Sequence, residues 1–178
     1  MTFVAHTLET APPAARRSIQ GVLKNMGYLP EGVALLAESP ETLNGFLQIS
    51  AAFENATLEP SAREVVIMTV AVRNGCHLCV AVHTAKLTGL GADEELIAAL
   101  RAGRSLPDTR LEALRLFTLE VITTAGAVSD EALKSFLGHG YTPRNALEVT
   151  LGVGAYTLST LANRMVGAPV DGPLRRFA

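Results

Sequence analysis

The chain has 178 residues, a formal net charge of −2 at pH 7 and a hydrophobic content of 48%. This length suffices for one substantial core, so we expect a single domain over residues 1–178, with residues 1–13 as a loose amino-terminal arm and residues 35–125 as the core. The weak net charge argues against a nucleic-acid partner, and no apolar run reaches the roughly 20 residues that span a membrane.

The amino-terminal residues show no basic region followed by an apolar block, which is the pattern of a secretory signal. We therefore expect a cytoplasmic protein. In that reducing compartment the two cysteines of the chain are expected to be redox-active or metal-binding rather than a structural disulfide.

Helical periodicity and capping signals recur along the chain, whereas almost no window alternates as a strand would. In chain order, helices are expected at residues 14–26, 31–37, 40–55, 60–74, 76–88, 93–102, 107–122, 130–138 and 143–166, followed by an irregular tail. Small residues on the last helix, such as Gly152 and Gly154, would let other helices approach closely. The sequence predicts an all-α, single-domain helical bundle of about eight helices.

Residues 74–83, Asn-Gly-Cys-His-Leu-Cys-Val-Ala-Val-His, contain both cysteines of the chain. If a helix begins there, Cys76 and Cys79 share one face and His83 lies one turn beyond Cys79 on the same stripe. His77 would point about 100° away from Cys76, as a surface residue or a modulator of thiol reactivity. Any thiol chemistry of this protein is expected in this segment.

A pair of cysteines with this spacing is typical of a peroxidase or of a disulfide-exchange protein. A helix amino terminus and a neighbouring imidazolium can lower a thiol pKa from about 8.5 to between about 3.5 and 7.5. The second thiol can then capture a sulfenic acid formed on the first, which closes a disulfide before irreversible oxidation.

Glu64 is the acidic member of an apolar run twelve residues before Cys76. Ser61 and Glu64 fit an S-x-x-E capping box, in which the carboxylate is bound to its own helix terminus. Alternatively, the helix that carries Glu64 packs against the cysteine helix and brings the carboxylate toward the two thiols. The sequence leaves both interpretations open.

Two other interpretations of the cysteine segment remain. Thiolates, imidazole and Glu64 could bind zinc, but structural zinc sites normally have two separated pairs of ligands, and this chain has no second such pair. The cysteines could also be small apolar core residues. We expect neither a metal nor a cofactor.

The run from Arg63-Glu64 through Cys76-x-x-Cys79-x-x-x-His83 resembles the core motif of the alkylhydroperoxidase D-like (AhpD-like) branch of the carboxymuconolactone decarboxylase superfamily. The resemblance includes Ser39-Pro40-Glu41 and Asn163-Arg164, and so covers most of the chain from about residue 30. It implies an all-helical domain that forms trimers or hexamers. We expect a hydroperoxide reductase, and the sequence leaves open whether its reductant is a lipoyl carrier, a thioredoxin-like protein or a small thiol.

By position, the resemblance implies that Cys79 is the peroxidatic thiol and Cys76 the resolving one, with Glu64 and His83 as a proton relay. Helix-dipole reasoning instead favours Cys76 as the more acidic thiol, so the order of attack stays open. The chain departs from the best-studied members at Leu78, where they carry a histidine.

Two alternatives to a peroxidase remain from the sequence. The branch that names the superfamily decarboxylates a lactone without relying on a cysteine pair, so the Cys-x-x-Cys of this chain argues against that reaction. A non-catalytic helical assembly module that keeps the scaffold is the other alternative.

Overall fold

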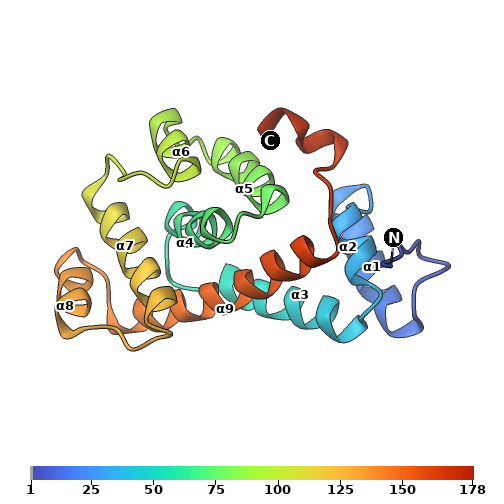
Figure 1. Cartoon of the computed structure of the whole chain (residues 1–178), viewed down its shortest axis with the longest axis horizontal. Helices are drawn as coiled ribbons and strands as arrows, with labels where there is room; N and C mark the ends of the chain where they lie inside the picture. The colour runs from blue at the N-terminus through green and yellow to red at the C-terminus, as the bar shows by residue number, and fades with distance from the viewer. Residues whose placement is uncertain (1) are drawn as a thin grey trace.

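The computed structural model describes residues 2–178, which form nine α-helices and one 3-10 helix without any strand (Figure 1). The elements are α1 (Pro13–Met26), α2 (Glu31–Leu36), α3 (Pro40–Glu54), α4 (Pro60–Arg73), α5 (His77–Gly89), α6 (Glu94–Arg101), α7 (Thr109–Thr123), α8 (Asp130–Gly138), α9 (Pro143–Met165) and η1 (Gly172–Phe177). The all-α prediction is confirmed. Within the described residues, no helix has both the length and the apolar character needed to cross a bilayer.

Local capping signals fix several of these helix boundaries. The Ser39 hydroxyl accepts a hydrogen bond from the backbone N–H of Thr42, and Pro40 occupies the first turn of α3. Thr142 and Asn145 form a reciprocal capping box at the start of α9. The predicted starts of these two helices are therefore confirmed.

The carboxyl-terminal segment differs from the irregular tail that the sequence predicts. Residues 172–177 form η1, which packs against α5. A side-chain oxygen of Asp171 accepts a 3.0 Å hydrogen bond from the backbone N–H of Glu31, and Arg101 donates a 2.6 Å hydrogen bond to the carbonyl of Phe177. The prediction was wrong because these partners lie far from the tail in sequence.

Helix α4 lies at the centre of the molecule (Figure 1), where it packs against α5, α7 and α9. All of its residues from 64 to 71 are buried. A helix that is apolar on every side belongs to a core, and α4 therefore holds its one buried carboxylate, Glu64, in an environment where a partner is required.

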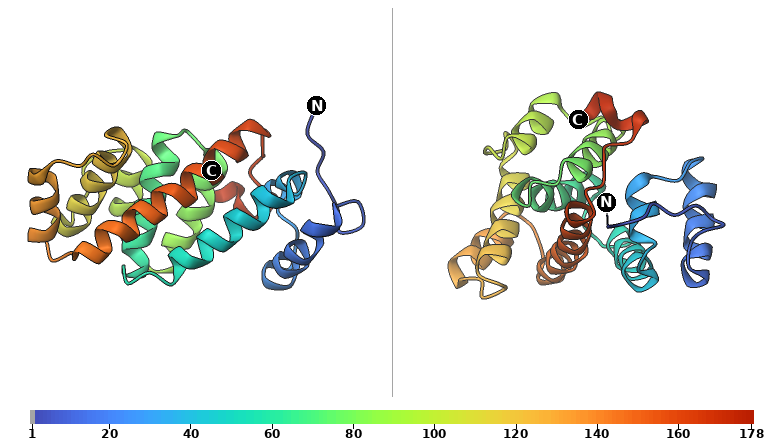
Figure 2. Two further views of the ribbon diagram at one scale, coloured as in Figure 1. Left: turned by 90° about the horizontal axis from the view of Figure 1, so that it is seen from below. Right: turned by 45° about the vertical axis from the view of Figure 1, so that its right-hand side comes forward.

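Helices α3 and α9 lie side by side across one face of the bundle (Figure 2). Gly152 permits this contact, since a Cβ atom at its position would lie 2.6 Å from Cζ of Phe53. Gly154 has no neighbour within 4 Å of the equivalent point. The prediction that small residues of the last helix allow close approach is confirmed for Gly152 and wrong for Gly154.

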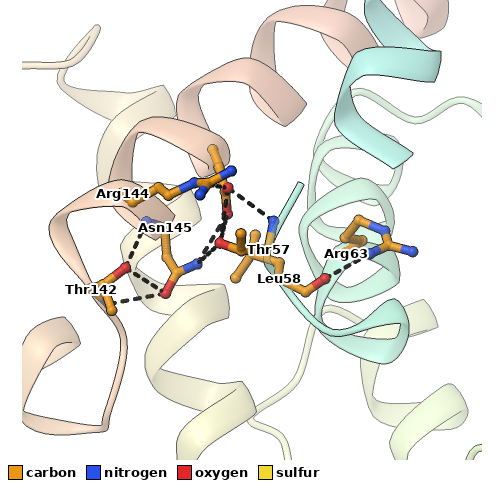
Figure 3. A network of polar contacts seen from close by, with 7 residues as sticks. Thr57, Leu58, Arg63, Thr142, Arg144 and Asn145 are labelled. Atoms are coloured by element: carbon orange, nitrogen blue, oxygen red, sulfur yellow. Dashed lines mark hydrogen bonds and ion pairs between the residues drawn. The ribbon is translucent and has the colours of Figure 1, made fainter. Parts of the chain in front are cut away.

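A polar network that includes the buried Asn145 and Glu148 attaches the start of α9 to the connection between α3 and α4 (Figure 3). The backbone N–H and the hydroxyl of Thr57 each donate a 2.9 Å hydrogen bond to Oε1 of Glu148. Nδ2 of Asn145 donates to both Thr57 and Glu148, and Arg144 donates to Glu148 at 3.0 Å. These bonds fix the position of α9, which carries part of the site described next.

Candidate functional site

The turn between α4 and α5 positions the first cysteine. Gly75 adopts a φ of 63°, a left-handed conformation that favours glycine, and the backbone N–H of Cys76 then donates to the carbonyl of Ala71. The Asn74 side chain donates a 2.8 Å hydrogen bond to Thr160, and Arg164 donates to the Asn74 carbonyl. The turn is thus held against α9.

Helix α5 begins at His77, one residue later than predicted, and Cys76 is its N-cap residue with extended backbone angles. Cys79 is the third residue of the helix. An N-cap residue and the third helical residue lie within one turn of each other, and this short separation brings the two thiols into interaction here. Both cysteines are buried free thiols.

The two thiols differ in acidity. Hydrogen bonding from the Cys79 thiol lowers the pKa of Cys76 to about 7; burial opposes this shift, whereas the first N–H groups of α5 and the positive charge of Arg164 support it. The same interaction with Cys76, together with burial, raises the pKa of Cys79. The pair therefore loses its first proton from Cys76, at a pH of about 7, while Cys79 keeps its proton.

Helix α9 supplies the polar partners of Cys79. Nδ2 of Asn163 donates a hydrogen bond to the Cys79 sulfur at 3.6 Å, and the Ser159 hydroxyl lies 3.9 Å from the same sulfur. Asn163 also donates to Ser159 at 3.3 Å, so the two side chains orient one another. Asn163 belongs to the Asn163-Arg164 pair included in the family resemblance, whereas Ser159 was not predicted from the sequence.

Glu64 and His83 form a buried pair between α4 and α5. Nδ1 of His83 donates a 2.6 Å hydrogen bond to Oε2 of Glu64, and both residues are 4% exposed. The capping-box interpretation of Glu64 is wrong, because Pro60 starts the helix and Ser61 falls inside its first turn. The carboxylate is therefore available for the imidazole.

Cys79 and His83 line a cavity of about 210 Å³ bounded by α1, α2, α3, α5, α9 and η1. Its wall is mostly aliphatic and aromatic and includes Phe46 and Tyr156. Among the described residues that line it, no lysine or arginine occurs. Cys76 is not part of this wall, so the cavity presents Cys79 and His83 to any molecule that occupies it.

Leu78, which stands where the best-studied AhpD-like proteins carry a histidine, forms part of the apolar wall. Its Cδ2 lies 3.0 Å from the point where a Cβ of Gly32 would be, and Oδ1 of Asn163 lies 3.1 Å from that point. Gly32 therefore lets α2 approach the cysteine helix closely and close the cavity.

His77 is exposed and lies on the outer side of α5, and no hydrogen bond within residues 2–178 involves its ring. The structure therefore does not bring it to the other predicted residues. No group of three histidine, cysteine or acidic side chains in the same range is arranged to hold a metal ion.

Sequence reasoning missed Lys86, whose ammonium group lies 3.7 Å from Oε1 of Glu64. The available signal was its position three residues after His83, which places both side chains on one face of α5.

A known protein family matches the part of the chain that carries the predicted motif. Residues 37–119, which contain all four residues of the predicted motif, match the model of the carboxymuconolactone decarboxylase family. The comparison with curated proteins finds no match.

Several solved structures share the fold. An AhpD core, an uncharacterized peroxidase-related protein from Ralstonia eutropha JMP134, is 21% identical with a TM-score of 0.84, over 97% of this chain and 93% of that one. A peroxidase-related protein from Silicibacter sp. TM1040 is 18% identical with a TM-score of 0.80, over 100% and 97%. A variant of the debrominase Bmp8 in complex with 2,3,4-tribromopyrrole is 14% identical with a TM-score of 0.72, over 93% and 89%.

The family match and the shared fold together confirm the resemblance drawn from the sequence. Residues 37–119 are similar to the carboxymuconolactone decarboxylase family, and the fold of the chain is that of the AhpD-like proteins.

Proposed function

We propose that this protein is a thiol-dependent oxidoreductase that reduces organic hydroperoxides through a Cys76/Cys79 dithiol–disulfide cycle. The observation that carries the proposal is a buried pair of interacting free thiols, one of which lies on the wall of an apolar cavity beside a histidine bound to a carboxylate. The AhpD-like fold and the family match support an antioxidant or decarboxylase-type enzyme.

The positions of the two thiols divide their roles. Cys79 reaches the cavity and so attacks the substrate, whereas Cys76 carries the resting thiolate outside the cavity and so resolves the product. The Cys79 proton must first leave, and Nδ1 of His83 already donates to Glu64, which leaves Nε2 as the acceptor. This order agrees with the roles implied by the resemblance.

The proposed reduction of a hydroperoxide has two chemical steps. The Cys79 thiolate attacks the terminal oxygen of ROOH, a sulfur–oxygen bond forms, the oxygen–oxygen bond breaks, and the leaving alkoxide takes the proton from His83 to become ROH. The Cys76 thiolate then attacks the sulfenic sulfur of Cys79, which forms the disulfide and releases hydroxide, protonated to water. The dithiol loses two electrons and the hydroperoxide gains them.

A dithiol partner of lipoyl or thioredoxin-like chemistry returns two electrons by thiol–disulfide exchange, which restores both thiols. Cys76 is the better leaving thiol in that exchange because its pKa is the lower of the two. The partner's thiolate is therefore expected to attack Cys79 and to release Cys76.

The cavity argues against lactone decarboxylation. That substrate must carry a carboxylate, and the lining residues include no lysine or arginine to hold one, while Asp171 would repel it. The apolar wall instead suits an uncharged organic substrate.

Reductive dehalogenation is a second candidate, favoured by the same uncharged wall with Phe46 and Tyr156 and by the fold shared with a debrominase bound to 2,3,4-tribromopyrrole. In that reaction the dithiol would again supply two electrons, the carbon–bromine bond would break, a carbon–hydrogen bond would form, and bromide would leave as the disulfide closes.

The test is turnover of the reduced protein with excess dithiothreitol and one substrate at a time. We expect alcohol from cumene hydroperoxide at a higher rate than reduction of hydrogen peroxide, because only the organic compound fills the apolar cavity. Cys79→Ser is expected to abolish turnover, and an exposed control, Ser129→Ala, to preserve it. Bromide release from a bromopyrrole without alcohol formation from cumene hydroperoxide would select the second candidate; no turnover with either would contradict both.

A further inference from the structure

A second cavity lies on the other side of Glu64. It has a volume of about 360 Å³ and is lined by Glu54, Pro60, Arg63, Glu64, Lys86, Gly89 and Leu90. None of these residues lines the cysteine cavity. The hydrogen bond between Glu64 and His83 therefore connects two separate cavities, one lined by Cys79 and one lined by Lys86.

The two oxygens of the Glu64 carboxylate have different partners. Oε2 accepts the hydrogen bond of His83, whereas Oε1 lies 3.7 Å from the ammonium nitrogen of Lys86. The same ammonium group donates a 2.8 Å hydrogen bond to Oε1 of Glu54 on α3. The ammonium group of Lys86 therefore lies next to Oε1 of the buried Glu64 carboxylate, and the Glu54 carboxylate holds this ammonium group in position.

The Lys86–Glu54 pair is ionised. Burial acts against the charge of Lys86, but the hydrogen bond to Glu54 and the negative charge of Glu64 outweigh it and raise the pKa of Lys86. Burial likewise acts against the charge of Glu54, and the hydrogen bond from Lys86 outweighs it and lowers the pKa of Glu54. Lys86 therefore faces Glu64 as a positive charge at neutral pH.

The other groups around the pair come from each packed helix. On α4, Nε of Arg63 lies 3.6 Å from Glu54 and Nη1 donates to the Leu58 carbonyl, so this guanidinium serves Glu54 rather than Glu64. On α9, the ring of Tyr156 meets that of His83 edge to face at 5.2 Å, and its hydroxyl lies 3.3 Å from the Ser50 hydroxyl. On α5, Cys79 shares the cavity wall with His83. Within residues 2–178, Lys86 is the cation that pairs with the far oxygen of Glu64.

We propose that Lys86, anchored by Glu54, is a positioning residue that holds the Glu64 carboxylate in place for His83 and thereby governs proton exchange by the Glu64–His83 pair. In this position the carboxylate fixes Nδ1–H of His83 toward α4 and leaves Nε2 for the substrate side. This inference rests on the proposed function insofar as the proton exchange serves the Cys79 thiol. A merely structural surface ion pair would contribute little to folding and would leave the proton exchange unchanged.

The test is a pH titration of the histidine ring signals by NMR on the reduced protein, with His83→Gln used to identify the signal of His83. Lys86→Met removes a positive charge near the Glu64–His83 pair, and the loss of this charge favours protonation of that pair. We expect the pH midpoint of the His83 signal to move upward by about one unit. Lys86→Arg is expected to restore the original midpoint, and the exposed Lys134→Met to leave it unchanged.

An unchanged or lower midpoint in Lys86→Met, or no restoration in Lys86→Arg, would overturn the inference. If Lys86→Met does not fold, Lys86→Gln removes the same charge with a polar side chain suited to a half-exposed position. Turnover of cumene hydroperoxide, measured on the same samples, separates the two proposals. If the wild-type protein is inactive but Lys86→Met shifts the midpoint of the His83 signal, only the peroxidase function is refuted.

Discussion

Glu64 on α4 accepts a 2.6 Å hydrogen bond from Nδ1 of His83 on α5, and both side chains are buried beside the cysteine cavity. A carboxylate in an apolar core requires such a partner. Glu64 and His83 meet only because α4 and α5 pack against each other. Their hydrogen bond also fixes the imidazole tautomer, since the proton on Nδ1 leaves Nε2 free to accept another.

Glu64→Gln keeps the size of the side chain but removes the charge that stabilises a protonated His83. We expect peroxide reduction to slow by about 10²-fold or more, which is the usual contribution of a positioned acid–base group. Stopped-flow measurement of thiol oxidation by cumene hydroperoxide checks the rate. The matched control is Glu59→Gln, because Glu59 precedes the same helix without a side-chain capping bond; equal rates in both variants would exclude a role for Glu64.

The two thiols should react with iodoacetamide over different pH ranges. Because the pKa of Cys76 is lowered to about 7, its thiolate forms as the pH rises through about 7, while the raised pKa of Cys79 keeps that thiol protonated there. Mass spectrometry of the alkylated peptides identifies the modified cysteine at each pH. Arg164→Gln removes a supporting positive charge and should move the Cys76 midpoint upward; modification of Cys79 first would contradict this assignment.

Gly152→Ala should destabilise the fold by about 1–3 kcal/mol, because its Cβ would lie 2.6 Å from Phe53 in the core. Gly154→Ala, two residues along the same helix, meets no neighbour within 4 Å and should stabilise α9 by up to about 1 kcal/mol. Urea denaturation of both variants measures the difference. Equal stability of the two would show that α3 and α9 are not packed as described.

The expectation of a homo-oligomer has a structural candidate on α9, where four large apolar side chains are exposed, namely Leu147, Leu158, Leu161 and Met165. Side chains of this kind on one helix are typical of a contact between subunits. We expect a trimer or hexamer by size-exclusion chromatography with light scattering. A strictly monomeric protein would refute the expectation.

Local signals in the sequence were sufficient for much of the fold. Ser39-Pro40 and Thr142-Pro143 mark helix starts because a capping hydroxyl and a first-turn proline act within one turn of the chain. The spacing of Cys79 and His83 places both on one face of α5 for the same reason, and the cavity wall includes both.

Contacts between distant segments were not predictable in this way. The partner of Glu64 depended on whether Pro60 or Ser61 began the helix and on how α4 packs against α5, and neither is encoded within one turn. The hydrogen bond between Asp171 and Glu31 joins residues 140 positions apart, and Lys86 meets Glu54 across 32 positions. A single sequence gives no signal for such pairs, so the order in η1 and the contact between Lys86 and Glu54 emerged only from the structure.

The most direct test of the account is the state of the two cysteines after the reduced protein meets one equivalent of cumene hydroperoxide. Intact-mass measurement and peptide mapping should find that the chain has lost two hydrogen atoms and that Cys76 and Cys79 are joined in one disulfide. Two free thiols after the reaction, or Cys79 oxidised to a sulfinic acid while Cys76 stays free, would contradict the dithiol cycle.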